Sequence, residues 1–293
     1  MVLPNFDYFI PSNLDEASRM LAELGPEARV MAGATDLIIP MKDHALKPEP
    51  KYLIDIKKIE GLDYLKFDDR EGLKIGALTT LRTLEHAELV KEKYPAVAAA
   101  AKSIASTQIR AKGTMAGNIC NASPSCDSGP IVLASDAGIL VHNTEGDREI
   151  RASEFFRGVK KTALEPGDIV TGIVFPPLEK NQKAVYLKHA VRKAMDLAIV
   201  GVAVIIKVEN EICTDARIAL GAVAATPIRA PKAEEALIGR RLTDEVIEEA
   251  AQLAMDSCSP ISDIRASKEY RSAMVKVFTR RAIKKALEQM QEV

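Results

Sequence analysis

Apolar residues follow two different spacings in the first part of the chain. Between residues 14 and 24 they recur at helical spacing, with Ser12 placed to cap the helix and Gly25 placed to end it. Short apolar runs at 28–33 and 52–56 have the length and the flanking residues of strands. With a helix expected between the two strands, at "TDLIIPMK" (residues 35–42), this pattern predicts a small β-α-β unit at the N-terminus.

Further along, short strands alternate with helices. Thr80 stands where an N-cap is expected, and Pro176 with Pro177 ends the last strand of this stretch. The expected elements are a strand at 73–77, helices at 81–89 and 95–106, a hairpin at 138–152 and a strand at 168–175. A second unit of mixed helix and sheet is therefore predicted.

The pattern changes at residues 177–183. Three strands are expected after this point, at 184–191, 197–208 and 213–223. From Ala230 onward nearly all of the chain has a helical pattern, including a helix that Thr243 begins. We therefore expect a domain boundary at 177–183, and an α+β fold overall.

Composition excludes several classes of protein. The 293 residues are 47% hydrophobic and 28% charged, with 40 Lys and Arg against 41 Asp and Glu, which is typical of a globular protein. A formal net charge of -1 gives no electrostatic case for nucleic acid or an anionic membrane. The longest apolar runs, such as "LAIVGVAVII", are far shorter than the roughly 20 residues of a membrane span. We find no signal-peptide pattern and expect a cytoplasmic protein.

The cysteines and histidines do not have the spacing of a metal site. Cys120 and Cys126 lie close together without zinc or iron–sulfur spacing, and Cys213 and Cys258 are isolated. No two of the four histidines fall within one helical turn. We expect free thiols and no metal site formed by this chain alone.

A glycine-containing loop, "MAGATDL" at 31–37, follows the second expected strand. Small side chains let successive backbone N–H groups approach an anion closely. A helix capped by Thr35 or Asp36 would add its own free N–H groups. Taken alone, the loop is better explained as an ordinary strand-to-helix turn.

A second loop, "TMAGNICNASPSCDSGP" at 114–130, is small, polar and rich in turn residues. Thr114, Gly117 and Asn118 offer a hydroxyl, a permissive backbone and an amide. Further polar side chains come from Asn121, Ser123, Ser125 and Asp127. A surface turn is the alternative, but two such loops favour an extended ligand that bears phosphate. Neither the G-x-G-x-x-G nor the G-x-x-x-x-G-K-[ST] pattern is present.

These paired motifs resemble the FAD-binding medium subunits of the molybdenum hydroxylases, the family of xanthine dehydrogenase and carbon monoxide dehydrogenase. The resemblance covers nearly the whole chain. It implies a two-subdomain FAD-binding domain at 1–178, of the fold shared with p-cresol methylhydroxylase and vanillyl-alcohol oxidase, divided near residue 60. It also implies a C-terminal domain at 183–293, with a three-stranded antiparallel sheet and a helical bundle, like that of the carbon monoxide dehydrogenase flavoprotein.

The resemblance also assigns residues to FAD. The first diphosphate loop would be Arg29, Val30, Met31, Ala32, Gly33, Ala34, Thr35 and Asp36. The second would be Thr114, Met115, Ala116, Gly117 and Asn118, and the remaining cofactor contacts would be Ile104, Asp127, Val170 and Lys188. A lysine near the flavin pyrimidine edge would favour the reduced anion, although a surface lysine on a strand is an equal alternative for Lys188.

Two departures from the family pattern bear on FAD. Ala34 and Ala116 each replace one glycine of the usual pairs, and alanine resists positive φ and very close approach. We still expect FAD to bind. No histidine lies in the first loop, so we expect the flavin to be non-covalent, one per chain.

The implied activity is that of an FAD-dependent oxidoreductase subunit of the xanthine dehydrogenase family. Electrons would come from [2Fe–2S] clusters of a small subunit, supplied by a molybdopterin large subunit, and would leave to NAD, oxygen, a quinone or another protein. No catalytic side chain is nominated, because the isoalloxazine carries the redox chemistry. The alternatives are a stand-alone flavin-dependent reductase of the same fold, such as the UDP-N-acetylenolpyruvoylglucosamine reductases, and a non-redox nucleotide-binding protein.

Overall fold

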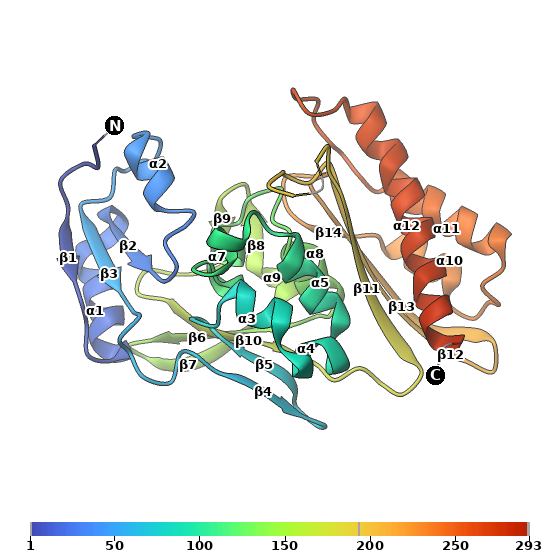
Figure 1. Cartoon of the computed structure of the whole chain (residues 1–293), viewed down its shortest axis with the longest axis horizontal. Helices are drawn as coiled ribbons and strands as arrows, with labels where there is room; N and C mark the ends of the chain where they lie inside the picture. The colour runs from blue at the N-terminus through green and yellow to red at the C-terminus, as the bar shows by residue number, and fades with distance from the viewer. Residues whose placement is uncertain (1, 193, 292–293) are drawn as a thin grey trace.

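The structure is a computed structural model that describes residues 2–192 and 194–291. Three main sheets follow one another along the long axis of the molecule, and helices pack against each of them (Figure 1). The molecule is therefore a row of three units, in the order of the chain. Of the helices in these residues, not one is long and apolar enough to cross a membrane.

The N-terminal unit is a parallel sheet of order β1-β3-β2. The expected β-α-β unit corresponds to β2, α2 and β3, and the strand β1 was not predicted. Its elements are β1 (Asp7–Phe9), α1 (Leu14–Leu24), η1 (Gly25–Glu27), β2 (Ala28–Met31), α2 (Ile38–Lys42) and β3 (Tyr52–Asp55). The N-cap of α1 is Asn13 and not Ser12, because Glu16 N donates to Asn13 Oδ1 at 2.9 Å. Ser12 instead donates to the Glu16 carboxylate. Gly25 ends α1 with φ 62°, as predicted.

The expected cap of the second helix is wrong. Helix α2 begins at Ile38, after Thr35 and Asp36, and none of the described side chains caps it. The reason is Ala34, which has φ 58° and turns the chain before a helix can start. The Ala34 carbonyl then accepts hydrogen bonds from Leu37 N at 3.1 Å and Ile38 N at 3.0 Å. Residues 32–37 consequently form a separate turn between strand and helix.

The middle unit is an antiparallel sheet of order β4-β5-β10-β6-β7. Its strands are β4 (Leu65–Asp68), β5 (Gly72–Gly76), β6 (Gly138–Asn143), β7 (Gly146–Arg151) and β10 (Ile169–Phe175), beside the small pair β8 (Phe156–Gly158) and β9 (Lys161–Thr162). Thr80 caps the first helix as predicted, since its Oγ1 accepts from Thr83 N at 3.1 Å.

The middle unit contains seven short helices, and several of them carry or flank the second loop. They are α3 (Leu81–His86), α4 (Glu88–Lys93), α5 (Pro95–Ser103), α6 (Thr107–Arg110), α7 (Met115–Cys120), α8 (Gly129–Ala134) and α9 (Ala152–Phe155). The second loop therefore includes one turn of helix, α7, which the sequence interpretation did not separate from its surroundings.

The C-terminal unit contains the three predicted strands and a short fourth strand, in the order β11-β12-β13-β14. The elements are β11 (Gln182–His189), β12 (Val200–Glu209), β13 (Ile212–Gly221), β14 (Ile228–Arg229), α10 (Pro231–Leu237), α11 (Asp244–Asp256) and α12 (Lys268–Gln291). Thr243 caps α11 as predicted. Three helices thus cover one face of a four-stranded sheet.

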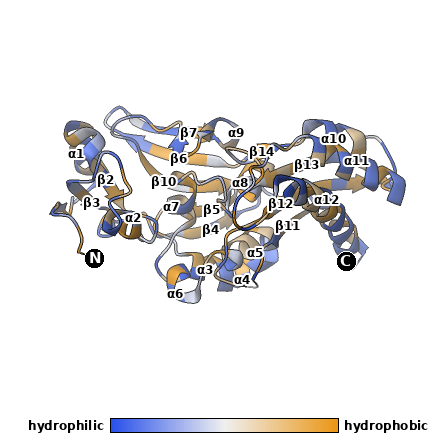
Figure 2. Cartoon of the chain, turned by 90° about the horizontal axis from the view of Figure 1, so that it is seen from above, coloured by the Kyte–Doolittle hydropathy of each residue, from blue (hydrophilic) through white to orange (hydrophobic). Residues whose placement is uncertain are grey.

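Both faces of this last sheet are buried. Val185 and Val202 pack into the core under α10, α11 and α12, whereas Tyr186 and Ala203 pack into the core of the middle unit, beside α5 and α8. Figure 2 shows apolar residues along the strands and polar residues on the outer turns of the helices. Burial on both sides explains the nearly unbroken apolar sequence of β12, and it brings β11 close to the second loop.

Candidate functional site

The two predicted loops meet in space. A Cβ atom added at Gly33 would overlap the carbonyl oxygen of Lys112, and one added at Gly113 would stand 3.2 Å from Thr35 Oγ1. Asn121 Nδ2 also donates to Asp36 Oδ2 at 2.8 Å, which joins the loops by their side chains. The backbones can approach this closely because both contacts fall on glycine.

The first loop presents unpaired backbone donors. Within the described residues, no acceptor receives a hydrogen bond from the N–H groups of Gly33, Ala34, Thr35 or Asp36. Such consecutive N–H groups around a residue in the left-handed region form a concavity suited to an anion. Ala34 occupies that position at a steric cost, since a left-handed residue with a Cβ costs about 1–2 kcal/mol.

The second loop leaves an open side next to α7. Thr114 Oγ1 caps this helix by accepting from Gly117 N at 3.0 Å. Gly117 is helical and exposed, and a Cβ atom there would meet only Thr114 Oγ1, at 3.1 Å. The glycine is therefore not needed for its φ angle. It leaves space outside the helix that a side chain would fill.

A cavity of about 320 Å³ lies where the two loops, the 104–109 segment and the 195–197 segment come together. Four of the predicted residues line it, namely Asp36, Ile104, Asn118 and Asp127. The other polar side chains noted in the second loop, Asn121, Ser123 and Ser125, line it too. The wall is mixed, with hydroxyl, amide and carboxylate groups beside apolar side chains, as is typical of sites for small molecules.

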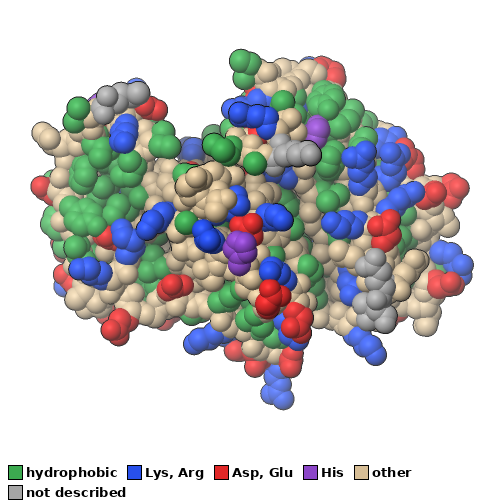
Figure 3. Space-filling model, in the orientation of Figure 1, with side chains coloured by type: hydrophobic (Ala, Val, Ile, Leu, Met, Phe, Trp, Pro, Cys, Tyr) green, Lys and Arg blue, Asp and Glu red, His purple; other side chains and the backbone are tan. Residues whose placement is uncertain are grey.

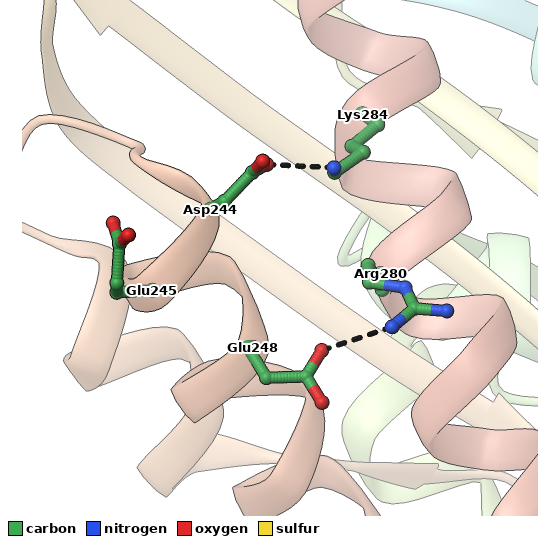
Figure 4. Close-up of a pocket in the computed structure, with 5 residues that line it drawn as sticks. All are labelled: Asp244, Glu245, Glu248, Arg280 and Lys284. Carbon is green, nitrogen blue, oxygen red and sulfur yellow. Dashed lines mark hydrogen bonds and ion pairs between the residues drawn. The ribbon is translucent and has the colours of Figure 1, made fainter.

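A slightly larger space, of about 380 Å³, is a different kind of feature. It lies between α11 and α12 (Figure 4), where Lys284 Nζ pairs with Asp244 Oδ1 at 2.6 Å and Arg280 Nη1 pairs with Glu248 Oε2 at 3.2 Å. These charges satisfy one another on the solvated faces of two helices. We interpret this cleft as the space beside surface ion pairs between two helices, and not as a ligand site.

Asp127 belongs to a buried polar cluster behind the cavity. Its Oδ2 pairs with Lys188 Nζ at 2.8 Å, and its Oδ1 accepts from Tyr186 OH at 3.2 Å. Burial raises the pKa of Asp127, and the Lys188 ammonium and the Tyr186 hydroxyl oppose that rise. The Lys188 side chain is 10% exposed, so the alternative of a surface lysine is wrong.

Other predicted residues lie around the cavity and not along its wall. Arg29 donates to the carbonyls of Pro26 and Ala28, away from the loop, and Val170 is buried on β10 opposite Val141. Several predicted residues are packed in or against the hydrophobic cores: Val30, Met31, Ala32, Met115 and Ala116. These residues shape the loops from behind.

The segment after β11 was missed. Met195, Asp196 and Leu197 line the cavity, and the exposed fractions of Met195 and Leu197 are 65% and 44%. The sequence predicted Met195 and Asp196 in the connection and Leu197 at the start of the next strand, but β12 begins only at Val200. The sequence signal for this part of the cavity is weak, because it consists of two apolar side chains, Met195 and Leu197, on either side of Asp196.

Two family models match the chain. The model described as FAD binding domain in molybdopterin dehydrogenase matches residues 4–178. The model described as CO dehydrogenase flavoprotein C-terminal domain matches residues 185–286. The first of these alone spans more than half of the chain.

Relatives match over nearly their whole length. The chain is 35% identical to the glyceraldehyde dehydrogenase medium chain of Sulfolobus acidocaldarius, over 97% of this chain and 99% of the relative. It is 32% identical to the xanthine dehydrogenase FAD-binding subunit of Escherichia coli O157:H7, over 96% of this chain and 95% of the relative. A solved structure of carbon monoxide dehydrogenase from Hydrogenophaga pseudoflava, lacking the Mo-pyranopterin moiety, superimposes with a TM-score of 0.94 at 32% identity, over 98% of this chain and 99% of that one.

The sequence, the fold and the paired loops agree with these matches. An FAD-binding domain spans the first two units, and the C-terminal unit corresponds to the second family model. The chain belongs to the family of FAD-binding medium subunits of the molybdenum hydroxylases, which are oxidoreductases related to xanthine dehydrogenase and carbon monoxide dehydrogenase.

Proposed function

We propose that the chain binds one FAD non-covalently across its two loops and transfers electrons as the medium subunit of a molybdenum-containing dehydrogenase. The observation that carries the proposal is the row of four N–H groups from Gly33 to Asp36, which have no acceptor among the described residues and lie next to a cavity of mixed polarity. A diphosphate needs such donors, and a flavin ring needs a wall that is partly apolar. The residues present therefore fit the cofactor.

Each part of the site has a separate task in this proposal. The N–H groups of the first loop and the open side of α7 at Gly117 hold the diphosphate. Ile104 and Leu197 supply apolar contact in the cavity, and Asp127 accepts a hydrogen bond there. When bound, FAD supplies redox chemistry at its isoalloxazine ring, which no side chain of the described site can supply. The protein's own contribution is binding, orientation and exclusion of water.

The electron donor must come from another polypeptide. Among the residues that the structure describes, no group of three or more His, Cys, Asp or Glu side chains could hold a metal ion. All four cysteines are free thiols, and burial raises the pKa of Cys120 and of Cys126 to about 12. We therefore assign the [2Fe–2S] clusters to a small subunit and the molybdopterin to a large subunit.

The rim of the cavity offers a docking face for such a subunit. Exposed Met195 and Leu197 line the cavity. Arg271 donates to Ile199 O at 2.8 Å and to Asp263 Oδ1 at 2.8 Å, which brings the 259–267 segment close to them. Ile261 and Ile264 on that segment are 73% and 99% exposed. In the space-filling view, apolar side chains lie on both walls of the notch between the N-terminal unit and the rest of the molecule, with Lys and Arg side chains among them (Figure 3). An apolar rim next to the flavin site is where an electron-donating partner has to dock.

FAD binding tests the proposal directly. We expect the purified chain to be yellow, or to become yellow with FAD, with one flavin per chain, because the donors and the cavity belong to one polypeptide. Calorimetric titration gives the stoichiometry, and acid precipitation should release the flavin, since no histidine lies in the first loop. A colourless chain that takes up no FAD in the titration would refute the proposal.

A further inference from the structure

The ammonium group of Lys188 has no donor left over for a ligand. It donates to Ser103 O at 3.0 Å, to Asp127 Oδ2 at 2.8 Å and to Asp196 O at 2.8 Å. An ammonium carries three N–H donors, so all of them are used. The side chain is also 10% exposed, so its tip is largely withdrawn from solvent.

The three acceptors belong to three separate walls of the cavity. Ser103 ends α5 and precedes Ile104, which lines the cavity, while Asp127 and Asp196 line it themselves. Lys188 is not a lining residue. It lies on β11, in the C-terminal unit, and reaches two segments of the middle unit.

The charges of Lys188 and Asp127 balance each other within the buried polar cluster. Asp127 compensates the ammonium, and Tyr186 OH occupies the other carboxylate oxygen. Removing one partner of such a buried pair is costly, because the remaining charge is left without compensation. Removing both charges avoids that cost but still removes the contacts to the Ser103 and Asp196 carbonyls.

We propose that Lys188 is a positioning residue that ties three walls of the FAD cavity together from behind and makes the C-terminal unit part of the site. This inference rests on the proposed FAD function of the cavity. It differs from the direct flavin contact that the sequence resemblance implies for Lys188. It also explains why a lysine, a compact point donor with three N–H groups, stands where three acceptors converge.

The test uses the full chain with Lys188→Met, Asp127→Asn and the double variant, each compared with Lys183→Met on the same strand. The Lys183 side chain has no hydrogen bond or ion pair among the contacts of the described residues, and its backbone stays in the β11–β12 ladder. FAD affinity is measured by fluorescence quenching. Hydrogen–deuterium exchange of residues 194–198 is measured on the chain without FAD. The exchange experiment reports on the hydrogen bonds that Lys188 makes, even if the cavity holds another ligand.

We expect Lys188→Met to weaken FAD binding by about tenfold or more, and the double variant to regain part of that loss, because no unpaired charge remains. Hydrogen–deuterium exchange at 194–198 should be fast in Lys188→Met and in the double variant, since both lack the Lys188 ammonium. It should be slow in the wild type and in Lys183→Met. If Lys188→Met does not fold, the double variant still provides the exchange result.

Two results would contradict the positioning role of Lys188. The first is additive losses of FAD affinity in the double variant, as a direct contact between Lys188 and the flavin would give. The second is wild-type protection of residues 194–198 in the double variant. Failure of the wild-type chain to bind FAD would instead refute the proposed function. The exchange experiment would still test the positioning role of Lys188.

Discussion

Gly117→Val is expected to reduce FAD binding below detection while leaving the chain folded. The first carbon of the new side chain would meet only Thr114 Oγ1, at 3.1 Å, so the remainder must extend into the space that we assign to the diphosphate. Valine is compatible with a helix at a cost below about 1 kcal/mol relative to alanine, so the fold should survive. Titration with FAD and a thermal melt by circular dichroism separate binding from stability.

Two further variants make this test specific. Gly117→Ala adds one methyl group and should weaken FAD binding less than valine does. Ala99→Val places the same valine on an exposed position of α5, away from both loops, and should leave FAD binding unchanged. If Gly117→Val binds FAD like the wild type, the diphosphate does not lie beside α7.

The purified chain alone is expected to show no hydroxylation of any purine, aldehyde or aromatic substrate. In the proposed assembly, hydroxylation with oxygen from water takes place in the molybdenum subunit, and the described residues of this chain offer no ligand set for a metal. Electron transfer from a reductant or NADH to an artificial acceptor needs only the flavin and can therefore occur. Activity should appear after co-expression with the neighbouring genes, with iron and molybdenum in the same size-exclusion peak.

The control for this experiment is the same complex assembled with the Gly117→Val chain. It should retain both metals and the molybdenum-dependent reaction with an artificial acceptor, but lose the flavin. Hydroxylation by the lone chain, free of metals, would contradict the subunit assignment. A stand-alone flavoenzyme would then be the better interpretation.

Local sequence patterns predicted most of the fold. Seven single strands (β2, β3, β5, β10, β11, β12 and β13), the hairpin at 138–152 and the caps at Thr80 and Thr243 follow from spacing and hydrogen-bonding chemistry within a few residues. The short strands β1, β4, β8, β9 and β14 were not predicted. The predicted cap at Thr35 or Asp36 failed because Ala34, whose side chain packs against a small core cluster, adopts a positive φ that alanine rarely adopts. The N-cap of α1 is Asn13 and not the predicted Ser12. Asparagine and serine have similar N-cap propensities, so the sequence could not decide between these adjacent residues.

The site was predictable only in part. Both loops stand out in the sequence, because small residues and turn residues gather there, and the structure brings them into contact. The wall at 195–197 and the partners of Lys188 could not be predicted from sequence. They depend on how the last sheet packs against α5 and α8, which is a property of two buried faces and not of any local motif.

The doubly buried sheet has a consequence for dissecting the protein. Ala184, Tyr186 and Ile205 complete the hydrophobic core of the preceding unit, so a recombinant fragment ending at residue 178 would expose an apolar surface. Such a fragment is expected to aggregate, although a family model ends at that residue. Calorimetry of the intact chain should show the middle and C-terminal units melting in one transition. In evolution, too, neither unit could be exchanged without rebuilding the face that they share.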